Sequence, residues 1–261
     1  MADVNDKYNP NDDQQAAITH PPAPLMILAG AGTGKTFTIE KRILYLLRNF
    51  NVDPKHILAI TYTEKAAKEL KNRILQHETN AKKLNISTFH SFCFKLLKEY
   101  NKKTLPHLLE TSETIHMFLE NFDNLKPFIS DEFPLDPQRA VTESFIPFIN
   151  RIRDELIDPA VMKIPDHTEE GPITMELANQ LRDLKRIFPF FQKWKKKKNV
   201  LDYGDMILQT YKLLSSNKDV LRKAQNQFRH IIVDEFQDNN FALNKIIQLL
   251  AGKRKFITVV G

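Results

Sequence analysis

A glycine-rich octapeptide, AGAGTGKT, occupies residues 29–36, directly after the apolar run LMIL and directly before a helical pattern. Glycines let the backbone curl so that several N–H groups converge on one anion, and the following helix adds its positive dipole end. Lys35 can then supply a charge for the outer phosphates of a nucleotide, and the Thr36 hydroxyl can ligate Mg²⁺. The sequence therefore predicts a phosphate-binding loop that consists of Ala29, Gly30, Ala31, Gly32, Thr33, Gly34, Lys35 and Thr36.

Two adjacent carboxylates follow a second apolar run, HIIV at residues 230–233. Downstream of a phosphate loop, Asp234 can hold the Mg²⁺ shell, and Glu235 can orient and deprotonate an attacking water. We therefore expect Glu235 and Lys35 to be catalytic, and Thr36 and Asp234 to be the metal ligands.

Base recognition has two candidates near the loop. The amide of Gln14 offers a donor and an acceptor side by side, which match N6 and N7 of adenine and could select ATP. Phe37 follows the loop directly. Its ring could stack on adenine or pack in the core.

The elements that must position these residues are short apolar runs separated by helical patterns. Strand-like runs occupy residues 25–28, 57–60, 84–87, 230–233 and 256–260, and amphipathic helical patterns occupy residues 36–48, 64–76 and 241–250. Alternation of strand and helix implies parallel strands buried on both faces. We predict an α/β fold in which helices flank a parallel sheet.

Residues 101–200 have a different character. Most of the prolines lie here, and the segment reads as helices broken by proline-containing loops. We therefore expect one domain from residues 1–100 plus 201–261, interrupted by an all-helical insertion at 101–200. The lysine run at 195–198 is expected to be the solvated end of a helix.

Charge and cysteine content restrict the class of protein. Residues 14–100 hold 13 Lys/Arg against 6 Asp/Glu, whereas residues 101–192 hold 10 against 16. Such a concentration of basic residues suits the binding of an anionic polymer such as nucleic acid. The single cysteine, Cys93, excludes a disulfide framework. An acidic, polar start and the lack of a long apolar run predict a cytoplasmic protein without a membrane segment.

Six motifs together resemble a known family. Gln14 with its QxxAI context, AGAGTGKT, ILAITYTEKAAKEL (57–70), STFHSFCFKLL (87–97), LDYGD (201–205) and DEFQD (234–238) resemble, in this order, the first half of the UvrD/Rep/PcrA and RecB/AddA group of superfamily 1 DNA helicases. The resemblance implies a motor that hydrolyses ATP with Mg²⁺ and moves 3′ to 5′ along single-stranded DNA. It also implies a RecA-like core, named 1A, with the helical subdomain 1B inserted.

The resemblance further implies a DNA-binding face on TYTEKAA and STFH. Its candidate contacts are Thr61, Tyr62, Thr88, Phe89 and His90, since aromatic faces stack on any base. Without the motif, Tyr62 would be a core residue at the end of a strand. Asp202 and Asp205 match a family position, but only a structural or coupling role is suggested for them.

The sequence leaves the exact activity open. It is similar to the 1A/1B part of a helicase that acts at single strands and duplex junctions, for example in DNA repair. We expect the chain itself to be a monomer. Because the last strand-like run stops at Gly261, we expect the chain to be a piece of a longer protein with little activity alone. The motor part of a RecB/AddA-like helicase–nuclease, or an ATP-binding switch that does not use DNA, are the alternatives.

Overall fold

The structure is a computed structural model that describes residues 9–30, 32–100, 106–164, 174–254 and 256–261. The chain forms two compact units. The first comprises residues up to Lys95, Lys212–Asn239 and Leu243–Gly261, and the second comprises Leu96–Tyr211 and Asn240–Ala242. Three of the four divisions fall within helices α4 (Phe89–Tyr100), α9 (Tyr203–Ser216) and α11 (Phe241–Ala251), and the fourth follows Asn239. The proline pattern instead suggests boundaries at residues 100 and 201.

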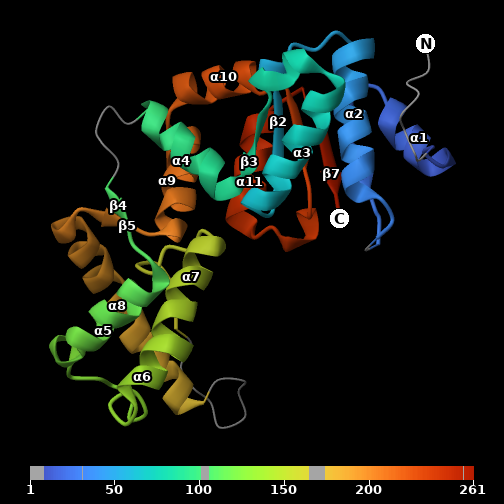
Figure 1. The fold of residues 1–261 in the computed structure, drawn as a ribbon. Helices are drawn as coiled ribbons and strands as arrows, with labels where there is room; N and C mark the ends of the chain where they lie inside the picture. Colours follow the sequence, from blue (N-terminus) through green and yellow to red (C-terminus); the bar gives the residue numbers. More distant parts are fainter. Residues whose placement is uncertain (1–8, 31, 101–105, 165–173, 255) are drawn as a thin grey trace. The chain divides into compact units, whose positions relative to one another are not determined.

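The first unit is built on a five-stranded parallel sheet (Figure 1). Its strand order is β1 (Leu25–Ile27), β7 (Ile257–Val260), β6 (His230–Val233), β2 (Ile57–Thr61) and β3 (Asn85–Thr88). All four neighbouring pairs are parallel. The five expected strands are therefore present, and the expected α/β fold is confirmed.

Helices cover the sheet because both of its faces are apolar. The helices α2 (Lys35–Asn49) and α3 (Glu64–His77) bury Ile43, Leu46 and Ile74 against alternate residues of β2, among them Ile57 and Ala59. The intervening strand residues, Leu58 and Ile60, are also buried, as expected for strands covered on both faces.

The other elements of the first unit are shorter. They are the helices α1 (Asp12–Thr19) and α10 (Lys218–Gln227), and the 3₁₀ helices η1 (Pro54–His56), η2 (Thr79–Lys83) and η5 (Phe236–Asp238). The first part of α4 and most of α11 also belong to this unit. None of the helices in the described residues is both long enough and apolar enough to cross a membrane.

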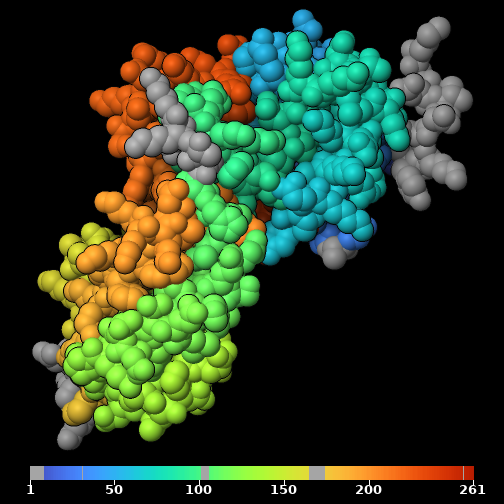
Figure 2. All heavy atoms as spheres, turned by 60° about the vertical axis from the view of Figure 1, so that its left-hand side comes forward, coloured from blue at the N-terminus to red at the C-terminus, as the bar shows by residue number. Residues whose placement is uncertain are grey.

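The second unit is helical apart from one short ladder. It contains α5 (Thr111–Glu120), η3 (Phe122–Leu125), α6 (Pro137–Arg139), the π-helical turn η4 (Ala140–Phe145), α7 (Ile146–Asp154) and α8 (Met175–Lys198). The two-residue strands β4 (His107–Leu108) and β5 (Val200–Leu201) pair in parallel, which the sequence did not indicate. As a result, the stretch with β4 and α5 (green) adjoins the stretch with β5 and the start of α9 (orange) on the surface (Figure 2).

Phenylalanines fill the core of the second unit. Phe118, Phe145 and Phe191 are almost completely buried, and their rings meet in edge-to-face and tilted pairs. Such pairs favour a defined packing beyond the apolar area that they bury. The unit therefore has its own hydrophobic core, separate from that of the sheet.

Candidate functional site

The phosphate loop connects β1 to α2 at the carboxyl edge of the sheet. Gly32 and Gly34 have φ values of +77° and +91°, which residues with a Cβ rarely adopt. The Thr33 hydroxyl donates to the Gly30 carbonyl at 2.8 Å and closes the turn. The loop therefore has the curled backbone expected from its glycines, although Ala31 lies outside the described residues.

The start of α2 is open to an anion. The helix begins after Gly34, which has no side chain to cap the first N–H groups. Thr36 lies exposed in this first turn. The Ala29 amide donates to the Gly261 carbonyl at 2.8 Å, so that the loop is anchored to the end of β7.

Lys35 and Glu235 meet although 200 residues separate them in the chain. Lys35 Nζ donates to Glu235 Oε2 at 2.8 Å, because β1 and β6 are parallel and end at the same edge. Gln237 Nε2 donates to the same oxygen at 2.6 Å. The sequence suggested no role for Gln237, although it lies within the DEFQD motif, two residues after the glutamate.

Hydrogen bonding sets the protonation of this pair. The hydrogen bond from Lys35, followed by that from Gln237, lowers the pKa of Glu235. The same hydrogen bond raises the pKa of Lys35. Both groups are therefore charged at neutral pH, and Glu235 is a weak base while Lys35 holds it.

Asp234 differs from its neighbour. Burial, followed by the charge of Glu235, raises the pKa of the Asp234 carboxyl. Its Oδ1 accepts the Glu235 amide at 3.0 Å, and its own amide is fixed to the Ile60 carbonyl of β2. A half-buried carboxylate that lacks a cationic hydrogen-bond partner among the described residues is suited to a divalent cation.

Gln14 reaches the phosphate loop from α1. Its Nε2 donates to the Thr33 carbonyl at 2.9 Å, and its Oε1 accepts the Asn11 amide at 3.1 Å. A pocket of about 290 Å³ lies beside it, lined by Gln14, residues 27–30, Thr33, Lys35 and Thr38, among others. The structure thus brings the expected base reader and the expected phosphate ligand to one cavity.

Phe37 is half-buried on α2, and Lys41 Nζ lies 5.5 Å from the centroid of its ring. Phe37 does not line the pocket beside Gln14. Its ring is therefore neither fully packed in the core nor placed in that cavity.

The five DNA candidates occupy two strand ends. Tyr62 is 69% exposed after β2, which excludes the core position that its place in the strand suggested. Thr61 and Thr88 are buried, and His90 is exposed. Phe89 is only 8% exposed, so its ring packs in the core and does not offer a face to a base.

Glu64 links these two segments, and the sequence did not indicate this role. Its Oε1 accepts from the Thr88 hydroxyl at 2.7 Å and from the Ser91 hydroxyl at 2.5 Å. The hydrogen bond from Ser91, then that from Thr88, lowers the pKa of Glu64. The carboxylate at the start of α3 therefore fixes the start of α4.

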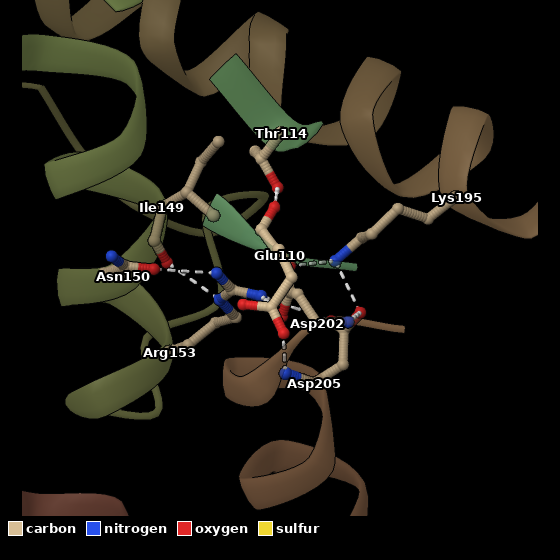
Figure 3. Close-up of polar contacts among 8 residues, drawn as sticks. All are labelled: Glu110, Thr114, Ile149, Asn150, Arg153, Lys195, Asp202 and Asp205. Carbon is tan, nitrogen blue, oxygen red and sulfur yellow. Dashed lines mark hydrogen bonds and ion pairs between the residues drawn. The ribbon is translucent and has the colours of Figure 1, made fainter. Parts of the chain in front are cut away.

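Asp202 and Asp205 belong to a buried charge cluster in the second unit, which we name the buried tetrad: Arg153, Lys195, Asp202 and Asp205 (Figure 3). Arg153 Nη1 donates to both carboxylates, and Lys195 Nζ donates to both at 2.9 and 2.5 Å. Arg153 also bonds to the Ile149 carbonyl and the Asn150 side chain. Two cations thus balance two anions, which gives the two acids a structural role.

The tetrad corrects one expectation. Lys195 was expected at the solvated end of a helix, but it is 2% exposed and its ammonium lies 4.2 Å from the Phe191 ring centroid. Lys195 follows Phe191 by four residues, so both lie on the same buried face of α8. The lysines after it are exposed as expected.

A parallel α/β sheet with a glycine loop between its first strand and a helix, and with an acidic strand end beside that loop, defines a P-loop domain. The sequence profile of the UvrD/REP helicase N-terminal domain matches residues 10–261. The chain belongs to this family.

Curated relatives agree with this assignment. The chain is 35% identical over 96% of its length to a probable DNA helicase II homolog of Mycoplasma capricolum, and 36% identical over 96% to the corresponding protein of Mycoplasma genitalium. It is 33% identical over 97% of its length to the ATP-dependent DNA helicase PcrA of Staphylococcus epidermidis. The chain spans about a third of the length of these relatives (33–35%).

Proposed function

We propose that the chain is the ATP-binding motor half of a DNA helicase, which uses ATP hydrolysis to move along single-stranded DNA. The observation that carries this proposal is the contact between Lys35 and Glu235 at the carboxyl edge of the sheet, beside the pocket that Gln14 lines. This arrangement unites a phosphate ligand, a carboxylate base and a base-reading amide. The names of the relatives, which are DNA helicases, support the same activity.

Nucleotide binding would use the open start of α2. The backbone of residues 29–34 would surround the phosphates, and the Lys35 ammonium would face the β- and γ-phosphates. Gln14 would exchange its contacts with Asn11 and Thr33 for the edge of adenine.

Mg²⁺ fits the oxygen donors at this edge. Thr36 offers an exposed hydroxyl, and Asp234 offers a carboxylate without a cationic hydrogen-bond partner among the described residues. The described residues contain no group of three or more His, Cys, Asp and Glu side chains placed to hold a metal. This donor set suits Mg²⁺, which takes few protein ligands and completes its shell with water and phosphate oxygens.

The contact of Glu235 with Lys35 has a consequence for turnover. As long as the lysine donates to Glu235, the carboxylate is a poor proton acceptor. A phosphate that attracts the Lys35 ammonium would weaken this hydrogen bond and raise the basicity of Glu235. The base would thus be available for water when a nucleotide is bound.

DNA binding would centre on Tyr62. Its exposed ring stands at the end of β2, and stacking on one face suits a motor that must ignore base sequence. His90 is exposed on the neighbouring segment and would approach the backbone. Phe89, Thr61 and Thr88 would support this face from the core.

We assign residues 1–100 and 201–261 to a 1A-like core and residues 101–200 to a 1B-like insertion. We further propose that the chain is a monomer, that it is cytoplasmic, and that it acts where single strands meet duplex DNA; a nuclease in the intact protein would place it with the RecB/AddA-like helicase–nucleases.

Nucleotide binding is testable with a fluorescent ATP analogue and the 261-residue chain. We expect Lys35→Ala to abolish binding, whereas Lys55→Ala, an exposed lysine of the same unit, leaves it unchanged. In the intact helicase, Glu235→Gln is expected to retain binding and lose hydrolysis. Hydrolysis at the normal rate in that variant would remove Glu235 as the base.

DNA binding is tested by titrating a fluorescent oligothymidylate at several salt concentrations. Tyr62→Ala should weaken binding by about 5- to 100-fold, the range of one base–aromatic stack. Phe50→Ala, which removes another exposed ring of the first unit, should not. Unchanged affinity in Tyr62→Ala, together with no salt dependence, would favour an ATP switch that does not use DNA.

A further inference from the structure

Arg42 is a buried arginine that the proposed site does not use. It lies on α2, two turns after Lys35, and is 2% exposed. Burial lowers the pKa of its guanidinium to about 10, which reflects the cost of removing this charge from water. The hydrogen bonds of Arg42 must therefore compensate for the loss of hydration of its charge.

These contacts join three elements of the first unit. Arg42 Nη1 donates to the carbonyls of Ala17 at 3.0 Å and His20 at 2.9 Å, with a longer contact to Ile18 at 3.4 Å. Arg42 Nε donates to the Thr258 hydroxyl of β7 at 2.8 Å. One guanidinium therefore binds the end of α1 from α2 and is itself oriented by the sheet.

The helix α1 depends on such a contact. It has only eight residues, and Ile18 is its one buried residue. Helices of this length are unstable without tertiary contacts. Its last turn contains no basic residue of its own, so Arg42 supplies the cation that favours a helix C-terminus.

Gln14 is carried by this same helix. Its amide contacts the phosphate loop at Thr33, and a Cβ on Gly34 would lie only 2.9 Å from Gln14 Nε2. This close approach leaves little room for α1 to shift. A hydrogen-bonding pair for a base needs a defined position, since short misplacements remove its discrimination.

We propose that Arg42 is a positioning residue for base recognition: it holds α1 so that Gln14 faces the nucleotide pocket and favours adenine over guanine. This inference rests on the proposed role of Gln14 as the base reader. Arg42 does not touch the nucleotide in this scheme, and it acts through the backbone of residues 17–20.

The experiment measures the affinities of fluorescent ATP and GTP analogues and reports their ratio. We expect Gln14→Ala to lower the preference for ATP by about tenfold, the scale of one bidentate base contact. Arg42→Met should lower the preference for ATP by about three- to tenfold, because it would displace Gln14 and weaken the same base contact. The double variant should show no greater loss than Gln14→Ala.

A second variant and one control separate positioning from folding. Thr258→Val removes the acceptor of Arg42 Nε and conserves side-chain shape. It should also lower the ratio, and it tests the contact even if Arg42→Met does not fold. Arg48→Met removes another arginine of α2, which donates to the His77 carbonyl of α3, and should leave the ratio unchanged. Binding of inorganic tripolyphosphate should persist in all folded variants, because the phosphate loop is intact.

The outcomes distinguish the two proposals. If Gln14→Ala lowers the ratio but folded Arg42→Met and Thr258→Val do not, the role of Arg42 is wrong and that of Gln14 stands. Additive losses of the ATP preference in the double variant would also overturn the positioning role of Arg42. If Gln14→Ala leaves the ratio unchanged, the assignment of the base reader fails, and the inference fails with it.

Discussion

Replacing Lys195 by methionine removes one cation from the buried tetrad and leaves two carboxylates with Arg153 alone. The side chains of Lys195, Arg153, Asp202 and Asp205 are 2%, 5%, 11% and 7% exposed, so water cannot take the place of the lost ammonium. Removing one partner of a buried ion pair costs about 3–5 kcal/mol. Because Arg153 still contacts both acids, we expect the lower limit, a loss of about 3 kcal/mol in the free energy of unfolding.

The contribution of the buried tetrad to stability can be measured with the fluorescence of Trp194, the one tryptophan of the chain, which precedes Lys195 on α8. Urea unfolding followed by its fluorescence reports the second unit. Lys197→Met, an exposed lysine of the same run, is the matched control and should change stability by less than about 0.5 kcal/mol. In Lys195→Met/Asp205→Asn the charges balance again, and most of the stability should return.

Acid should reduce the difference in the free energy of unfolding between the wild type and Lys195→Met. Burial alone would raise the pKa of Asp202, but the charges and hydrogen bonds of Arg153 and Lys195 outweigh it and lower this pKa from 3.8 to about 2. A carboxylate whose pKa is lower in the folded state adds stability above its unfolded pKa, and this stability is lost as the pH falls through the folded pKa. The difference should therefore be largest near neutral pH and narrow between about pH 4 and pH 2. A loss below about 1 kcal/mol at pH 7 would refute the argument.

Three further substitutions test local geometry. Gly204→Ala should destabilise the second unit by about 1–3 kcal/mol in urea unfolding, because its Cβ would lie 2.7 Å from Arg153 Cζ. Asn199→Ala should lower the free energy of unfolding by about 1 kcal/mol and Asn199→Gly by less, since this residue ends α8 in the left-handed conformation at φ +54°. Equal losses in the two variants would show that the left-handed conformation is not the cause. Gly34→Ala should weaken binding of an ATP analogue, because φ is +91° and its Cβ would meet Gln14; normal affinity would show that the loop adapts.

The sheet was predictable because its strands are buried on both faces. A strand of this kind reads as a continuous apolar run, and ILAI and HIIV were found in this way. The phosphate loop was predictable because glycine and lysine occur at fixed spacing between a strand and a helix. Both features are local in the chain.

The contacts of single side chains were not predictable in the same way. Lys195 is one of four consecutive lysines, and composition makes it equivalent to its neighbours. Its helical phase distinguishes it, since it follows Ile187 and Phe191 on the buried face of α8. Its acidic partners lie after α8, Asp202 just before α9 and Asp205 in the first turn of α9, so only the tertiary structure brings them together.

The candidate DNA face illustrates the same limit. Each of the two motifs offers an aromatic residue, and the sequence suggested a core position as the alternative for Tyr62 but not for Phe89. In the fold, Tyr62 extends from a strand end, whereas Phe89 begins α4 and packs inward. The hydrogen bonds of Glu64 to Thr88 and Ser91 fix the second segment beside the first. We infer a division of roles in which the Tyr62 segment stacks on bases and the Phe89 segment holds it in position, so that one ring supplies most of the stacking energy.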